Sequence, residues 1–244
     1  MEAIGLVLLL LLLPLLLFLV IRVRAGKAGE LRPLPGMEEL PKAVGRSAET
    51  NQPLHVSVGV AGVGGAATAE TWAGLALLSE LAEQAVASDA PLIVTVGDPT
   101  VLPIAQDILR RAYARHGRPN GYDPTQVRFI APVPLAYAAG VMGLLQREPL
   151  RGNVMVGTFG DEYLLMGEAG ARKGVPQIVG SADPRTLPFV YATADEPLIG
   201  EEMFASSPYV GRGPLQVASL LAEDWARWAI IAAIIGLAIL KILA

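Results

Sequence analysis

The sequence predicts an α/β fold: a mostly parallel, Rossmann-like three-layer sheet flanked by helices, with one transmembrane helix at each terminus. Between residues 54 and 212, short apolar segments alternate with longer segments of helical periodicity, which is typical of parallel sheets covered by helices. The apolar segment Leu92–Val96 indicates a strand that is buried on both faces. Long apolar runs at the two ends of the chain predict the membrane-spanning helices.

The first apolar run, residues 3–23, is expected to be the N-terminal transmembrane helix. The run carries no charge from Ala3 to Ile21. At about 1.5 Å per residue, a helix of this length crosses most of a bilayer core. A cleaved signal peptide is the alternative, but Glu2 precedes the run and no basic residue does. Basic residues follow the run, so the positive-inside rule places the next domain in the cytoplasm and both termini outside it.

Residues 213–244 are expected to form a long helix that includes a second span at about residues 226–243. Lys241 is the only charge in the apolar run Trp228–Ala244, and it lies close enough to the end to reach the headgroups. Trp225 and Trp228 stand where aromatic rings favour the membrane interface. A buried C-terminal helix is the alternative, although the run has no polar face to present to water.

Residues 24–53 are rich in proline, glycine and charge, which predicts a linker with room for a short helix near Met37. Residues 54–212 form the predicted cytoplasmic α/β domain. Strands are expected at residues 54–60, 92–96, 127–131, 153–158, 177–181 and 189–192. Helices are expected at residues 68–87, 99–116, 134–148, 160–174 and 199–204, the first of them capped by Thr68.

The composition excludes several classes of site. The chain has no cysteine, which rules out disulfides, thiolate catalysis and Cys-based metal sites. Its two histidines, His55 and His116, are too few for a His-rich metal site, and His55 is expected to be structural. The basic stretch at residues 110–151 lacks interleaved aromatic residues or a known motif, so no nucleic-acid partner is expected. No catalytic residue or metal ligand is predicted.

The glycine-rich loop after the first strand of the domain is the most specific candidate for a binding site. Its pattern is G-x-x-G-x-G-G, and the candidate residues are Gly59, Gly62, Gly64, Gly65, Thr68 and Asp98. Such a loop before a helix can bind a phosphate-containing ligand through backbone N–H groups, and a carboxylate such as that of Asp98 can bind the ribose of the ligand. However, Asp98 lies 34 residues past Gly64, further than the usual ~20, and no P-loop lysine follows. Glycines that serve tight turns and packing are the alternative.

Six carboxylates follow predicted strands and are therefore expected to gather at one edge of the sheet, where α/β proteins usually bind ligands. They are Asp98, Asp161, Glu162, Asp183, Asp195 and Glu196. Together they could serve acid–base chemistry or hold Mg²⁺. Three of them directly precede proline, where an acidic residue commonly starts a helix or turn, so capping is the alternative.

Charge and small residues predict self-association. Residues 110–151 contain seven basic and two acidic residues, a balance of +5, whereas residues 161–202 contain three basic and eight acidic residues, a balance of −5. Regions of opposite charge on two copies of the chain can contact each other. Small residues spaced four apart favour the packing of helices in lipid. The expected interface residues are Arg110, Arg111, Arg115, Glu201, Glu202, Ala232 and Gly236. An ordinary surface with uneven charge is the alternative.

Four segments of the sequence resemble those of a known family: PLIVTVGDPT, ILRRAYARHGRP, NVMVGTFGDEYLLMGE and ATADEPLIGEEMFA. With them, nearly the whole chain resembles an uncharacterised bacterial membrane-protein family, classed as a domain of unknown function and known chiefly from filamentous green bacteria and their relatives. The resemblance implies an α/β domain between two terminal spans in the bacterial inner membrane. It implies no activity, cofactor or catalytic residue.

These observations lead to three hypotheses. The first is a membrane-anchored module that self-associates into a scaffold on the cytoplasmic face, with lipid, its own copies and other membrane proteins as partners. The second is a sensor that binds a nucleotide or another small ligand through the glycine-rich loop. The third is an enzyme at the membrane surface that uses the strand-end carboxylates.

Overall fold

The computed structural model of the protein describes residues 2–25, 33–205, 209 and 214–243. The side chains of residues 2–12 and of part of the C-terminal helix lie outside the described residues. The chain divides into two units: Pro33–Val210 forms the larger one, and Met1–Arg32 together with Gly211–Ala244 forms the smaller one.

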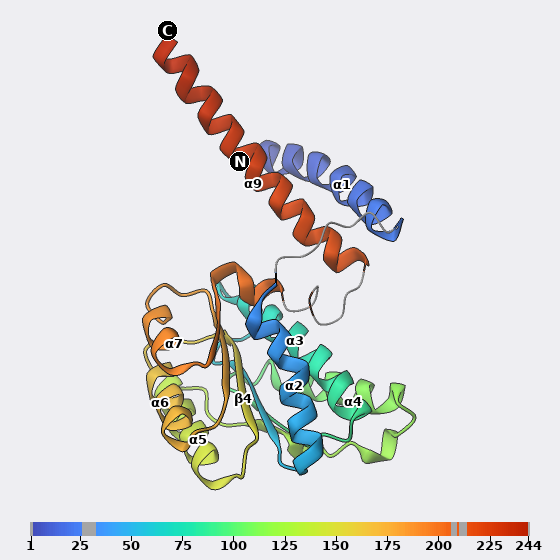
Figure 1. The fold of residues 1–244 in the computed structure, drawn as a ribbon, viewed down its shortest axis with the longest axis vertical. Helices are drawn as coiled ribbons and strands as arrows, with labels where there is room; N and C mark the ends of the chain where they lie inside the picture. The colour runs from blue at the N-terminus through green and yellow to red at the C-terminus, as the bar shows by residue number, and fades with distance from the viewer. Residues whose placement is uncertain (1, 26–32, 206–208, 210–213, 244) are drawn as a thin grey trace. The chain divides into compact units, whose positions relative to one another are not determined.

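The larger unit is built on a six-stranded sheet with the order β3-β2-β1-β4-β5-β6. Figure 1 labels β4, which lies between the helices of the two sides. All pairings between the strands of this sheet are parallel. The strands are β1 (Leu54–Gly59), β2 (Leu92–Val96), β3 (Val127–Phe129), β4 (Gly152–Thr158), β5 (Gln177–Ser181) and β6 (Glu196–Ile199). The α/β fold with a parallel, Rossmann-like sheet is thereby confirmed.

Helices cover both faces of this sheet. Figure 1 shows α2, α3 and α4 on one side and α5, α6 and α7 on the other. Their bounds are α2 (Pro35–Thr50), α3 (Thr68–Ala87), α4 (Leu102–Arg115), α5 (Pro134–Arg147), α6 (Tyr163–Lys173) and α7 (Leu187–Thr193). Short 3₁₀ turns lie at η1 (Pro119–Gly121), η2 (Pro124–Gln126) and η3 (Gly200–Ala205).

The core fills the space between these layers. On one face, Leu75, Leu78 and Leu81 of α3 are fully buried. On the other, Tyr137 of α5 and Tyr163 of α6 belong to a buried cluster of mainly apolar side chains. Burial on both faces explains why the strands are so uniformly apolar.

Two predicted segments differ from the structure. Residues 35–50, expected to be linker, form helix α2, because Pro35 occupies the first helical turn, where proline is tolerated, and Met37, Leu40 and Val44 are buried on one face. Residues 189–192, expected to be a strand, belong to helix α7. A short apolar run does not distinguish strand from helix by its periodicity.

The smaller unit contains helices α1 (Glu2–Arg24) and α9 (Pro214–Leu243), which pack against each other. Leu19 of α1 is buried, while Leu17, Phe18, Trp228 and Ile234 are more than half exposed. Both terminal runs are therefore helical, as predicted. Among the described residues, however, no helix combines the length and apolar character that a membrane crossing requires, so the structure does not support the two predicted spans.

Candidate functional site

The glycine-rich loop, residues 60–67, lies where the order of strands reverses. The chain leaves β1 for β2 on one side, and β4, β5 and β6 continue on the other, so β1 and β4 flank the switch point of the sheet. In doubly wound sheets this crevice, at the carboxyl ends of the strands, is the usual ligand site. The sequence could not predict this coincidence, because it requires the strand order.

An irregular pairing between β1 and β4 ends at this point. Ser57 pairs with Met155 and Gly59 pairs with Thr158, so two residues of β4 oppose one residue of β1. A Cβ atom on Gly157 would lie 2.0 Å from the carbonyl oxygen of Val58, which explains the glycine within this bulge. The bulge thus depends on a close approach of two backbones at the rim of the candidate site.

The predicted glycines fall into two groups. A Cβ atom on Gly59 would lie 2.5 Å from the Thr158 carbonyl oxygen, and one on Gly62 would lie 2.5 Å from the Asp98 carboxyl carbon, so packing explains both. In contrast, no atom of the described residues lies within 4 Å of the position a Cβ would take on Gly64 or Gly65. Gly64 has a φ of +103°, which favours glycine. Neither packing nor backbone conformation explains why residue 65 is a glycine.

Thr68 acts on the loop rather than as the predicted helix cap. Helix α3 begins after Ala67, and no side chain caps it. The Thr68 hydroxyl accepts a hydrogen bond from the Gly64 N–H (2.9 Å) and donates one to the Gly65 carbonyl (2.6 Å). The loop is thus held in shape by Thr68, and the N-terminus of a 20-residue helix opens beside it.

Asp98 reaches the loop despite its distance in sequence. Its Oδ1 accepts hydrogen bonds from the backbone N–H and the hydroxyl of Thr100 (2.8 and 2.5 Å). The Thr100 hydroxyl in turn accepts one from the N–H of Val63 (3.2 Å), which ties the end of β2 to the loop. Asp98 Oδ2 makes no hydrogen bond among the described residues, and it remains available at the site.

Two further polar atoms near the switch point lack partners. The Thr158 hydroxyl at the end of β4 and Oε2 of Glu70 in the first turn of α3 are buried without a hydrogen bond. Such atoms require an explanation because burying an unpaired polar group costs about 1–3 kcal/mol. Sequence reasoning missed both residues, and the feature that identifies them is their position directly around the glycine-rich loop.

A chain of buried polar side chains runs under the site, on the face of the sheet that α5 covers. Tyr137 contacts the hydroxyls of Ser57 (2.6 Å) and Thr95 (2.8 Å), and Thr95 contacts Nε2 of His55 (2.9 Å). The chain begins at the end of β1, directly before the glycine-rich loop, because the Gly59 N–H donates to Ser57 (3.3 Å).

On the other side of His55 the chain continues across β4 and β5. His55 Nδ1 lies 2.7 Å from Oδ1 of Asn153, whose amide donates to Oε1 of Gln177 (2.8 Å). Gln177 then donates to the backbone carbonyls of Gly167 and Thr193. Because the Asn153 oxygen can only accept, His55 carries its proton on Nδ1 and accepts from Thr95 at Nε2. Both ring nitrogens of His55 therefore have a partner, which agrees with the prediction of a structural histidine.

Burial sets the charge state of this chain. It lowers the pKa of His55 to about 4, an effect that the hydrogen bond to Asn153 opposes and that the positive charge of Arg128 strengthens. It also raises the pKa of Tyr137 to about 12. Both side chains are therefore neutral at pH 7, as expected for a network enclosed in the core.

Comparison with protein families assigns the whole chain. The model of a domain of unknown function, DUF6754, matches residues 2–244. The chain belongs to the DUF6754 family. No curated protein and no solved structure matches it. The family assignment agrees with the resemblance seen in the sequence in that both indicate a domain of unknown function, and it brings no activity to the DUF6754 chain.

The predicted set of strand-end carboxylates is not brought together. Asp195 and Glu196 lie at the amino end of β6, because residues 187–193 are helical and the strand begins only at Glu196. The prediction that they share an edge with Asp98 was therefore wrong. At the carboxyl edge, Asp183 is occupied by Arg185, whose hydrogen bonds lower the pKa of that carboxyl group. Among the described residues, no three acidic or histidine side chains are placed to hold a metal ion.

The basic residues predicted for self-association are paired within the DUF6754 chain. Arg110 and Arg111 both bind Asp107, and Arg115 binds Glu83 (2.5 Å). These acidic partners lie outside residues 110–151, so the surface charge of this region is smaller than the sequence balance of +5 suggests.

The other predicted interface residues have varied surroundings. Glu202 accepts a hydrogen bond from the N–H of Ile199 (3.1 Å), and Glu201 is exposed in the same 3₁₀ turn. In α9, Ala232 is exposed and no atom lies within 4 Å of a Cβ on Gly236. Their role in self-association stays a prediction.

Proposed function

We propose that this protein is a ligand-binding α/β module whose glycine-rich loop takes the phosphate of a nucleotide. The observation that carries the proposal is the position of Gly64 and Gly65 at the switch point, with open space where their side chains would be. Packing accounts for the other two glycines of the motif but not for these. Open backbone at this point lets a ligand approach closely.

The surrounding groups indicate how such a ligand would bind. A phosphate would accept hydrogen bonds from N–H groups of the loop after Gly64 and from the uncapped N-terminus of α3, whose dipole favours negative charge. The unused Oδ2 of Asp98 suits a ribose hydroxyl. The long separation of Asp98 from the loop in sequence reflects the 20 residues of α3, and it does not keep the carboxylate away from Gly62.

A nucleotide titration of the full chain in mild detergent tests the proposal. Thermal unfolding is followed with mononucleotides and dinucleotides, each with and without Mg²⁺. A ligand at 100 times its Kd raises the free energy of unfolding by about 2.7 kcal/mol, which moves the transition by several degrees. The blocking variant is Gly65→Val, because Gly65 tolerates a side chain without a clash or a positive φ.

The matched control is Gly45→Val in α2, another glycine with open space around it. Gly65→Val is expected to leave the melting temperature of the free protein unchanged and to abolish the nucleotide shift, whereas Gly45→Val retains the shift. Absence of a shift with any nucleotide, or an equal shift in Gly65→Val, would refute the proposal.

We further propose that helices α1 and α9 hold this module at a bacterial inner membrane. The proposal is supported by the uncharged stretch between Ala3 and Ile21 and by the large exposed apolar side chains of both helices. Basic residues after the first run favour a cytoplasmic α/β domain. Partition of the full chain into vesicles, and its release by alkaline carbonate, separates an inserted helix pair from a peripheral one.

Self-association into a scaffold is the second candidate. It is favoured by the exposed Ala232 and by Gly236, which lie one turn apart on α9. No atom of the described residues lies within 4 Å of the position a Cβ would take on Gly236. Gly236→Ile should then shift native mass spectra from oligomer to monomer. An assembly that is unchanged by this substitution would remove α9 from the interface.

A further inference from the structure

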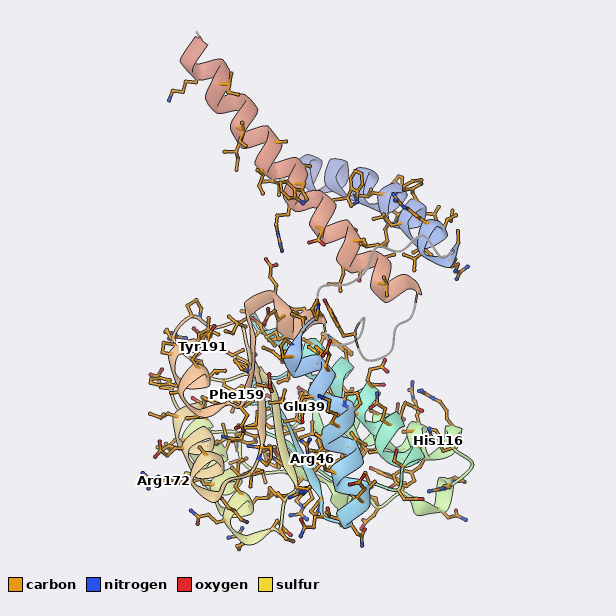
Figure 2. The ribbon with its side chains drawn as sticks, in the orientation of Figure 1. Glu39, Arg46, His116, Phe159, Arg172 and Tyr191 are labelled. Carbon is orange, nitrogen blue, oxygen red and sulfur yellow. The ribbon has the colours of Figure 1, made fainter. Side chains whose placement is uncertain are left out.

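A hollow lies at the amino ends of the strands, on the edge of the sheet opposite the glycine-rich loop. Its volume is about 240 Å³, and α2, β4, β5 and β6 line it. Figure 2 shows Glu39 and Arg46, both of which line the hollow, along α2. Because typical ligand pockets measure about 300–1,000 Å³, this hollow suits only a small molecule.

Arg46 lines this hollow, and a part of its guanidinium has no hydrogen-bond partner among the described residues. Its Nη1 donates to Oε1 of Glu39 (2.5 Å), but Nε is buried and has no hydrogen-bond partner. No described residue bonds its Nη2. The Nε and Nη2 atoms together form the edge that binds a carboxylate through two parallel hydrogen bonds. A ligand carboxylate would therefore supply the acceptors that this edge of Arg46 lacks.

Two buried amides form the deepest part of the wall. Asn153 and Gln177 are almost completely buried, and both line the hollow. The Asn153 amide uses one hydrogen for Gln177, and its second hydrogen has no partner among the described residues. The buried polar chain fixes both amides, so this wall is rigid.

Carboxylates complete the opposite side. Asp195 and Glu196 line the hollow at the start of β6, and one oxygen of Asp195 accepts the N–H of Gln177 (2.7 Å). With Glu39, which pairs with both Arg46 and Lys42, three carboxylates line the hollow. This excess of negative charge disfavours a simple anion and favours a ligand that also carries a positive group.

We propose that this hollow binds a small zwitterion of the size of a free amino acid. The ligand carboxylate would bind the unpaired Nε and Nη2 edge of Arg46, and its ammonium group would lie against Asp195 and Glu196. Both charges of the ligand are required, since either one alone would leave the opposite charge of the hollow unmatched. This site is separate from the glycine-rich loop, and it does not depend on nucleotide binding.

Titration calorimetry of the full chain with the twenty free amino acids tests this proposal. At least one is expected to bind, and its N-acetyl and carboxamide derivatives are expected to bind at least tenfold more weakly. Arg46→Lys keeps a positive charge beside Glu39 but removes the forked edge, so it should weaken binding at least tenfold. Glu196→Gln should weaken the amino acid more than its N-acetyl derivative.

Arg172→Lys is the matched control, because Arg172 forms an exposed pair with Glu168 on α6 (Figure 2 labels Arg172). It should bind like the wild-type protein. Circular dichroism of each variant establishes that it is folded before titration. The proposal is overturned if no amino acid binds the folded wild-type protein at millimolar concentration, if Arg46→Lys binds as well as wild type, or if the N-acetyl derivative binds equally.

Discussion

The stability of the protein should depend on pH through the buried His55. The pKa of this imidazole is about 4 in the folded protein, against 6.5 as its ordinary value. Between these two values the unfolded chain binds a proton that the folded protein excludes, so the free energy of unfolding falls as the pH falls. At about 1.4 kcal/mol per pKa unit, the loss between pH 7 and pH 4 amounts to about 3 kcal/mol.

The perturbation that isolates this effect is His55→Gln. Glutamine does not titrate, so the variant should lack this part of the pH dependence. At pH 7 it should be less stable than wild type by about 1–3 kcal/mol, because Asn153 loses the donor on His55 Nδ1. The two proteins should therefore converge in stability as the pH approaches 4.

Urea unfolding followed by far-UV circular dichroism at several pH values from 7 to 4 measures these differences. The control is His116→Gln, since His116 is the other histidine of the chain and lies near the surface beside Glu83. Carboxylates with lowered pKa values, such as Glu39 and Asp183, destabilise all three proteins equally in acid. A constant difference between wild type and His55→Gln across this range would refute the assignment of a neutral buried imidazole.

Two further predictions concern contacts that hold the fold. Lys173 donates to the carbonyls of Leu145, Gln146 and Glu148 at the end of α5. In urea titrations, Lys173→Ala should therefore lower the free energy of unfolding by about 1–3 kcal/mol. The control Arg172→Ala removes an exposed ion pair and should change it by less than about 0.5 kcal/mol. Gly157→Ala should prevent the bulge in β4 and lower the thermal midpoint strongly, whereas Gly45→Ala should raise it slightly. An unchanged midpoint in Gly157→Ala would show that the bulge can relax.

The elements with strong local signals were predictable from the sequence. Strands 92–96 and 177–181 match the structure to the residue, and the helix predicted from the Thr68 cap to about Ala87 corresponds to α3, because turns, glycines and prolines bound these elements clearly. The ion pair between Asp107 and Arg111 was also predictable from its spacing of four on a helix. In contrast, Arg115 binds Glu83 across 32 residues, and no local pattern reveals such a partner.

The errors arose where a local signal has two meanings. Pro35 and Pro41 indicated a linker, although proline at the first turn of a helix starts α2. The apolar residues at 189–192 fit either a strand or a helix, and the wrong choice placed Asp195 at the wrong edge of the sheet. The predicted spans rest on apolar runs whose side chains lie partly outside the described residues.

The candidate site was only half predictable. The glycines and Asp98 were identified from the sequence, but their meeting at the switch point depends on the pairing of β1 with β4, which lies almost 100 residues further along the chain. The distinction between packed and open glycines likewise requires the positions of Thr158 and Asp98. The members of the buried polar chain around His55 come from three other strands and one helix, so no single segment shows them.

Nucleotide binding at the glycine-rich loop is tested most directly by the amide signals of the loop itself. The chain has 26 glycines, and selective ¹⁵N-glycine labelling reports them together, with the Gly65 signal assigned by its loss in Gly65→Val. A nucleotide is expected to shift the signals of Gly62, Gly64 and Gly65 while Gly45 and Gly174 stay in place. Saturating nucleotide that leaves the three loop signals unmoved, or that shifts only glycines elsewhere, would contradict the account.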